Sequence, residues 1–196
     1  MRWARMRINH LRAEIFEHFP VLETARLRLR ESGHDDAEAT LAVLSSEEVC
    51  RYYDLSPLTV RAEAAALIEN RAAAFAREER IRWALALRED DLVIGSCGLS
   101  RWDEEAAQAE VGYELTPARQ GRGLMREALS AVLGFGFDRM RLARVEANVV
   151  PENEQSLRLL RRLGFREVEL RRGRGFWKGE PHDLIHLLLR REDWHG

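Results

Sequence analysis

The sequence has little cysteine: Cys50 and Cys97 are the only two, far apart and without the spacing of a metal site. Such scarcity is typical of a reducing compartment and argues against structural zinc, so we expect no metal. No run of about eighteen apolar residues occurs, and the N-terminus lacks the apolar core of a signal peptide. We therefore expect a cytoplasmic protein that does not bind a membrane.

An excess of charge of one sign is also missing. The chain carries 31 Lys and Arg against 33 Asp and Glu, a formal net charge of −2, which does not favour nucleic acid as a partner. Its 196 residues, 45% of them hydrophobic, suffice for one well-buried core. Without repeats or low-complexity linkers, we expect a single domain over residues 21–196 after an N-terminal extension, residues 1–20. The role of the extension stays open, as does the oligomeric state, including a homodimer.

A glycine-spaced basic turn is the most informative feature present. It joins a predicted strand, Gln108 to Leu115, to an amphipathic helix, Gly123 to Phe137. Glycines let the backbone curl and approach a ligand closely, and a new helix offers free amides and the positive end of its dipole. The turn therefore predicts a binding site for a phosphate or diphosphate, with a purely structural turn as the alternative. Its residues are Gln120, Gly121, Arg122, Gly123, Leu124, Met125 and Arg126.

Two common phosphate-binding motifs do not fit this turn. A P-loop needs Lys and then Ser or Thr after its last glycine, whereas Leu124 and Met125 follow Gly123. A dinucleotide fingerprint needs a third glycine where Arg126 stands. The sequence thus argues against nucleoside triphosphate hydrolysis and against a Rossmann domain.

A second helix begins with two polar residues on its apolar side. A predicted strand, Arg144 to Val149, leads through a Pro-containing turn into a helix with Gly164 as its stop. At helical spacing, Asn153 and Ser156 fall on the side of the leucines. Buried polar groups need hydrogen-bond partners, so these two residues either cap the helix or point into a cleft and bind a ligand.

Together, the two segments resemble the GNAT superfamily of acyl-CoA-dependent N-acetyltransferases, specifically its ribosomal-protein N-terminal (alanine) acetyltransferase branch. The diphosphate motif of the family appears as Gln120 to Met125, and its second motif as Asn148, Asn153-x-x-Ser156 and Leu163-Gly164-Phe165. Further segments resemble strands of the family in the same order: Leu22 to Arg30, Ile94 to Leu99, Ala109 to Leu115 and His182 to Leu189. The resemblance spans about residues 21–193.

This resemblance implies both a fold and an activity. The fold is α/β, with a mixed and largely antiparallel central sheet of about seven strands flanked by helices. The activity is an acyltransferase reaction in which a primary amine directly attacks acetyl-CoA in a ternary complex. The branch implies a protein N-terminal α-amine as acceptor. A small amine of another class and a non-catalytic acyl-CoA-sensing module remain alternatives.

The resemblance also implies roles for individual residues. Backbone amides of Glu114, Leu115 and Thr116 would polarise the thioester carbonyl. Ser156 would donate toward the departing sulfur, and Asn153 would hold the pantetheine arm or orient Ser156. The implied coenzyme A site comprises Glu114, Leu115, Thr116, Gln120, Gly121, Arg122, Gly123, Leu124, Met125, Arg126, Asn148, Asn153 and Ser156. Many members carry a smaller residue where this chain has Met125.

The general base is inferred from strand alternation. Glu110, Gly112 and Glu114 share one side of their strand, and if this side faces the acceptor, Glu110 is our preferred base, acting through water. The alternative is a surface carboxylate paired with an arginine. Some members of the branch instead place a carboxylate near the position of Gly175. At pH 7, deprotonating an α-amine of pKa about 8 costs about 1.4 kcal/mol, against about 4.6 for a lysine, so an N-terminus needs no strong base.

Overall fold

The computed structural model describes residues 11–52 and 54–196 of the chain. Its centre is an eight-stranded sheet in the order β1-β2-β3-β4-β5-β6-β8-β7. Neighbouring strands are antiparallel except β5 and β6, which are parallel. The strands are β1 (Leu22–Glu23), β2 (Leu27–Arg30), β3 (Arg80–Leu87), β4 (Val93–Asp103), β5 (Gln108–Leu115), β6 (Arg144–Val149), β7 (Arg166–Trp177) and β8 (Glu180–Arg190). The predicted α/β class is confirmed, with eight strands rather than about seven.

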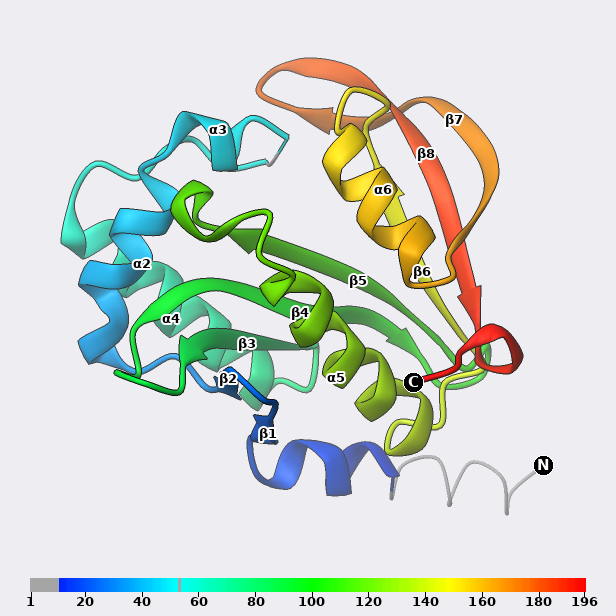
Figure 1. Cartoon of the computed structure of the whole chain (residues 1–196), viewed down its shortest axis with the longest axis horizontal. Coiled ribbons are helices and arrows are strands. Elements are labelled where there is room, and N and C mark those ends of the chain that lie inside the picture. The colour runs from blue at the N-terminus through cyan, green and yellow to red at the C-terminus, as the bar shows by residue number, and fades with distance from the viewer. Residues whose placement is uncertain (1–10, 53) are drawn as a thin grey trace.

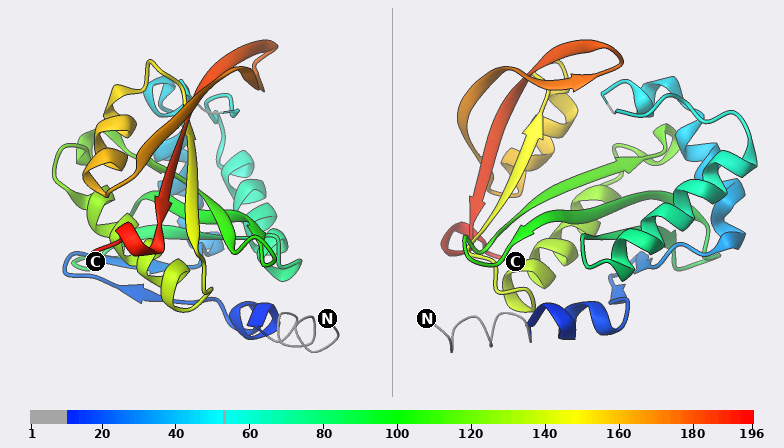
Figure 2. Two further views of the ribbon diagram at one scale, coloured as in Figure 1. Left: turned by 90° about the vertical axis from the view of Figure 1, so that its right-hand side faces the viewer. Right: turned by 180° about the vertical axis from the view of Figure 1, so that it is seen from behind.

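Helices cover both faces of this sheet. The α-helices are α2 (Ala37–Leu44), α3 (Glu47–Cys50), α4 (Arg61–Ala76), α5 (Leu124–Asp138) and α6 (Glu154–Arg162). Short 3-10 turns are η1 (His34–Asp36), η2 (Pro117–Arg119) and η3 (Arg191–Asp193), and residues 11–17 are also helical. Figures 1 and 2 show α5 and α6 on one face and α4 on the other. The strands between them, β3 and β4, are buried over most of their length because both of their faces are covered.

The part of the predicted extension that the structure describes packs against the sheet. Ile15 is buried, and the Trp83 indole nitrogen donates to the Pro20 carbonyl oxygen at 2.6 Å. Arg12 lies 4.7 Å from the centre of the Trp102 ring and donates to the Trp102 carbonyl oxygen. These contacts bury apolar surface near the start of β3 and the end of β4. Residues 1–10 of the predicted extension lie outside the described residues.

The predicted first strand, Leu22 to Arg30, is interrupted. The chain turns at Thr24 to Arg26, and β1 folds back on β2 so that Leu22 lies opposite Leu29. The Thr24 amide donates to the Leu27 carbonyl oxygen at 2.9 Å, and the Thr24 hydroxyl lies 3.1 Å from the same oxygen. No glycine or proline marks this turn in the sequence, so the resemblance to a family strand gave one continuous strand over Leu22 to Arg30.

The feature that positions the site is the divergence of β5 from β6. The two strands pair only where Gln108 to Glu110 lie beside Arg144 to Glu146. Beyond this point β5 follows β4, whereas β6 follows β8, and the two strands separate (Figure 2). The open end of β5 leads through η2 to the start of α5, and β6 leads to α6. Both segments singled out by their motifs therefore begin at the wide end of the gap.

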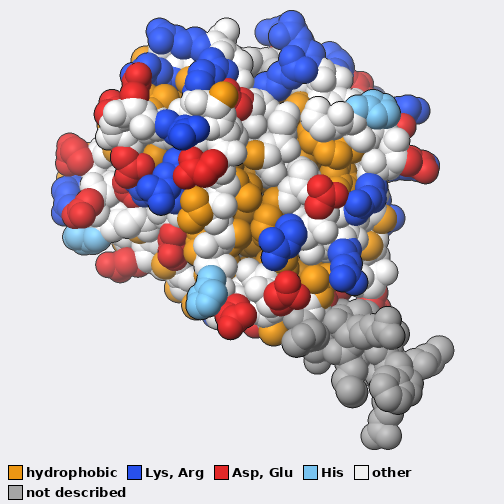
Figure 3. Space-filling view, turned by 60° about the horizontal axis from the view of Figure 1, so that its bottom comes forward, with side chains coloured by type: hydrophobic (Ala, Val, Ile, Leu, Met, Phe, Trp, Pro, Cys, Tyr) orange, Lys and Arg blue, Asp and Glu red, His pale blue; other side chains and the backbone are white. Residues whose placement is uncertain are grey.

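Charges of both signs are interspersed on the face in Figure 3, with hydrophobic side chains between them. This distribution matches the small net charge of the chain. No helix within the described ranges is long and apolar enough to cross a membrane.

Candidate functional site

The glycine turn forms a cradle of backbone amides. Gly121 and Gly123 have φ of 72° and 74°, the left-handed region that only glycine adopts at little cost. Gly123 is the N-cap of α5 and, having no side chain, makes no capping hydrogen bond to the first amides of the helix. Because an uncapped helix start leaves backbone donors available, the turn presents them together with the positive end of the α5 dipole. This arrangement is suited to an anion.

The side chains of the turn do not cover its backbone amides. Leu124 and Met125 are buried in the core cluster, so the bulk of Met125 does not obstruct the amides. Arg122 and Arg126 are exposed, and neither has an ion-pair partner among the described residues. Their charges are therefore available to a bound anion.

Gln120 joins the two sides of the gap. Its amide nitrogen donates to the Leu115 carbonyl oxygen at 3.1 Å, and its amide oxygen accepts from the Gln155 side chain at 3.1 Å. One contact lies at the end of β5 and the other on α6. Gln120 therefore connects these two elements at the mouth of the gap.

The backbone amides at the end of β5 point alternately toward β4 and toward the gap. The Thr116 amide donates to the Ile94 carbonyl oxygen at 2.9 Å, so it is directed toward β4 and away from the gap. Because successive amides of a strand point to opposite sides, the Glu114 amide is directed toward β4 as well. Of the three amides expected to polarise a carbonyl, that of Leu115 remains as the donor facing the gap.

On the other side of the gap, Asn153 caps α6. Its side-chain oxygen accepts from the Ser156 amide at 3.1 Å, which corresponds to the capping alternative and also fixes the backbone of Ser156. Ser156 is half-buried. Asn153 therefore acts on Ser156 through the backbone, and the serine hydroxyl takes no part in the cap.

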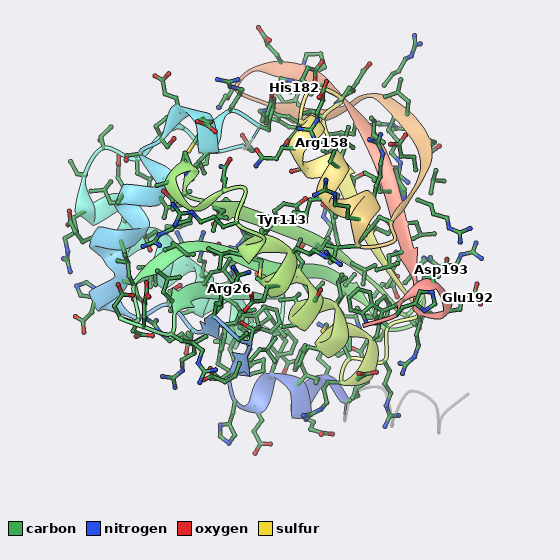
Figure 4. The ribbon with its side chains drawn as sticks, in the orientation of Figure 1. Arg26, Tyr113, Arg158, His182, Glu192 and Asp193 are labelled. Atoms are coloured by element: carbon green, nitrogen blue, oxygen red, sulfur yellow. The ribbon has the colours of Figure 1, made fainter. Side chains whose placement is uncertain are left out.

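Tyr113 is a residue that the sequence reasoning missed. It projects from β5 (Figure 4), and its phenol oxygen is buried without a well-formed hydrogen bond to the described residues. Burial raises the pKa of Tyr113 to about 12, although the nearby Ser156 hydroxyl acts in the opposite direction. The phenol is therefore protonated at neutral pH beside the serine. The sequence does contain a sign of this role, because Tyr113 places a hydroxyl among the aliphatic residues of its strand face.

The opposite face of β5 carries the predicted carboxylates. A Cβ at Gly112 would lie 3.3 Å from the Arg82 guanidinium, and Arg82 also pairs with Glu114, so both positions share one face as predicted. The Glu114 side chain is 4% exposed and also contacts Arg71 at 3.2 Å and the Ser96 hydroxyl. Buried in this cluster, it is not available to a ligand.

Glu110 is the more accessible carboxylate of this face, with a side chain 27% exposed. Its carboxylate accepts a hydrogen bond from the side-chain amide nitrogen of Asn148 at 3.2 Å and lies 3.3 Å from the Arg101 guanidinium. Asn148 also contacts Arg171 at 3.4 Å. Asn148 therefore lies with Glu110, on the face opposite α6, and the structure does not bring it together with Asn153 and Ser156.

The hairpin position proposed for a base in other members is closed here. A Cβ at Gly175 would lie 2.3 Å from the Trp177 ring, so a side chain there would collide with the indole. The indole itself stacks on His182, with ring centres 4.0 Å apart. Glycine at position 175 is thus required by the packing of Trp177.

Neither cysteine has the surroundings of a nucleophile. Both are buried, and burial raises the pKa of the Cys97 thiol to about 12. Among the described residues, no group of three or more His, Cys, Asp or Glu is arranged to hold a metal.

A family model described as an acetyltransferase (GNAT) domain matches residues 26–166, which include the cradle, both strands of the gap and α6. The chain belongs to the GNAT family. It is an acyl-CoA-dependent N-acetyltransferase, in agreement with the names of its relatives.

Three known proteins illustrate the similarity of this GNAT enzyme to others. The N-acetyltransferase YoaA of Bacillus subtilis is 36% identical over 165 residues, 84% of this chain and 93% of the relative. The ribosomal protein uS5 alanine N-acetyltransferase of Escherichia coli is 33% identical over 84 residues, 43% of each chain. The structure of Mycobacterium smegmatis RimJ in complex with CoA-disulfide superposes with a TM-score of 0.79 at 21% identity, covering 88% of this chain and 87% of RimJ, and shows the fold alone.

Proposed function

We propose that this GNAT enzyme transfers the acetyl group of acetyl-CoA to the α-amine of a protein N-terminus, by direct attack in a ternary complex. The observation that carries the proposal is the gap between β5 and β6, with an amide cradle at its mouth. The Leu115 amide lies on one side of this gap and Ser156 on the other. The cradle matches the need of a thioester donor for a diphosphate site, and the strand edges that no longer pair beyond Glu110 offer backbone groups to its arm.

The donor is held mainly by backbone. The diphosphate of coenzyme A lies on the amides of Gly121 to Arg126, with Arg122 and Arg126 adding charge at the rim. The pantetheine arm follows the gap past Gln120 toward Ser156. The RimJ structure named with a bound coenzyme A derivative supports the choice of donor.

The chemistry of aminolysis is assigned to three groups. As the C–N bond forms, the Leu115 amide stabilises the developing oxyanion. As the C–S bond breaks, the Ser156 hydroxyl donates a proton to the sulfur and takes one back from solvent, with the neutral Tyr113 phenol beside it. Glu110 accepts the proton lost by the amine, through a water molecule.

An α-amine is an acceptor that the weak base of this site can deprotonate. The only base assigned here is a carboxylate that already contacts Asn148 and Arg101, and Trp177 closes the hairpin position where another would stand. An α-amine costs about 1.4 kcal/mol to deprotonate at pH 7, whereas a lysine costs about 4.6. The relative named for the alanine of ribosomal protein uS5 also supports an N-terminus as acceptor.

Thiol release from acetyl-CoA tests this function. We expect turnover with a peptide that begins with alanine and none with the same peptide carrying a blocked N-terminus and an internal lysine. Faster turnover with a polyamine than with the peptide would show that the acceptor is a small molecule and not a protein N-terminus. Tight binding of acetyl-CoA by calorimetry without turnover of any acceptor would favour a sensing module instead.

A matched pair of substitutions tests the cradle. No atom of the residues that the structure describes lies within 4 Å of a Cβ placed at Gly121, so a side chain fits, and Asn and Asp are the residues that best tolerate its left-handed φ. Gly121→Asp should raise the Kd for acetyl-CoA by about tenfold or more relative to Gly121→Asn, because a carboxylate near the diphosphate adds repulsion. Calorimetry with both variants measures the difference. Equal Kd values would place the diphosphate elsewhere.

A second pair tests the base. Glu110→Gln should lower kcat/KM for the peptide by about 10²-fold, since general-base catalysis contributes factors of this size. The control is Glu146→Gln, because Glu146 lies beside Glu110 on β6 and pairs with Arg144 at 3.6 Å. Initial rates with both variants decide the assignment. A loss confined to the control, or absent from both, would remove Glu110 from this role.

A further inference from the structure

Arg26 lies at the point where the turn between β1 and β2 meets the start of α5 (Figure 4). Its Nε donates to the Glu127 carboxylate at 2.7 Å, and its Nη1 donates to the Arg122 carbonyl oxygen at 2.9 Å. One planar guanidinium therefore contacts both the first turn of α5 and the glycine turn before it.

The contact with Arg122 determines how the next amide points. In a planar trans peptide, the carbonyl and the amide hydrogen point in opposite directions. Because the Arg122 carbonyl is directed at Arg26, the Gly123 amide hydrogen is directed away from Arg26, toward the other side of the turn. The peptide unit joins Arg122 to Gly123, and Gly121 comes before it; both glycines have φ in the left-handed region, which glycine adopts at little steric cost. The hydrogen bond from Arg26 thus fixes a peptide orientation that the sequence of the turn does not.

Glu127 holds Arg26 in this position. Its carboxylate accepts from the Thr24 hydroxyl at 2.6 Å and from the Arg26 amide at 2.7 Å, in addition to the guanidinium. Burial disfavours the charged carboxylate, but these donors outweigh it and lower the pKa of Glu127. The pair also cancels a negative charge in the first turn of α5, where it would otherwise repel an anion in the cradle.

The remaining nitrogen of Arg26 lies close to Gly123, behind the cradle. Nη2 would lie 3.6 Å from a Cβ at Gly123. The guanidinium therefore places its positive charge next to the N-cap of α5, on the side opposite the direction of the Gly123 amide.

We propose that Arg26 is a positioning residue for the diphosphate of coenzyme A. It locks the peptide between Arg122 and Gly123 so that the Gly123 amide is a fixed donor, and it neutralises Glu127 behind the cradle. This inference rests on the proposed coenzyme A site. It adds a residue of the β1–β2 turn to a site whose other parts come from β5, α5 and α6.

Two acetyl donors distinguish positioning from general stability. Arg26→Gln should raise the KM for acetyl-CoA by about tenfold with kcat retained, which corresponds to the loss of roughly one charge-assisted hydrogen bond. With S-acetylpantetheine, which lacks the diphosphate, kcat/KM should not change. Arg26→Lys should show the same rise, because an ammonium cannot reach Glu127 and the Arg122 carbonyl at once, and it keeps the protein folded if the glutamine variant unfolds.

Arg28→Gln is the control. Arg28 lies on the same hairpin, half exposed, and pairs with Glu23 at 3.4 Å. The KM for acetyl-CoA and the KM for S-acetylpantetheine should therefore stay at wild-type levels in this variant. Equal losses with both donors in the Arg26 variants, or no change with either, would overturn the proposal. A wild-type protein that binds no acetyl-CoA would instead refute the proposed function, so the two failures are distinguishable.

Discussion

Replacing Ser156 with alanine should lower kcat by about 10²-fold while the Kd for acetyl-CoA stays within about twofold. The serine hydroxyl is assigned to the departing sulfur, an interaction that matters as the C–S bond breaks and contributes little to ground-state binding. The Asn153 cap binds the backbone amide of residue 156, which alanine keeps, so the helix start is retained when the one oxygen is lost. Single-turnover rates together with calorimetry separate the two quantities.

Tyr113→Phe completes this test. The phenol lies beside Ser156, so the two hydroxyls form one unit if the tyrosine supports the serine. The double variant should then have about the same kcat as Ser156→Ala alone, because the effects of substituting two residues that act on one proton do not add. Additive losses would mean that Tyr113 acts separately. An unaltered kcat for Ser156→Ala would remove the serine from the acid role, and a parallel rise in Kd would make it a binding residue.

The parts of the site that could be predicted from the sequence are those built from local patterns. Two glycines before an amphipathic helix predicted the cradle, since positive φ is a property of the residue itself. Period-two alternation correctly placed Glu110, Gly112 and Glu114 on one strand face. Helical spacing placed Asn153 and Ser156 at the start of α6 but left capping and binding equally open, and the structure gives Asn153 the capping contact.

The parts that could not be predicted depend on long-range order. Asn148 meets Glu110 and Arg171 because β6 lies between β5 and β8 in the sheet, with β7 beyond β8, an order that local patterns do not encode. Arg26 reaches the cradle because the chain turns at Thr24 without glycine or proline. The sequence reasoning considered arginines near the cradle only within the turn itself, whereas the structure brings one from a distant hairpin.

Glu114→Gln should lower the free energy of unfolding by about 3–5 kcal/mol, the cost of removing one partner from a buried ion pair. The substitution keeps the shape of the side chain but removes the charge shared by Arg71 and Arg82, whose side chains are only 12% and 13% exposed. Urea denaturation measures the change, with an unchanged m-value showing that the unfolded state is not affected.

Glu110→Gln is the matched control for stability, because it is the same change on the same face of β5. Glu110 pairs with Arg101, a side chain 80% exposed, and surface pairs contribute at most about 1 kcal/mol. A cost for Glu114→Gln below about 1 kcal/mol would show that solvent or rearrangement compensates the two arginines. Since Glu114 immediately precedes Leu115, the buried cluster anchors the end of β5 to β3, β4 and α4, on the side of the gap that carries the Leu115 amide.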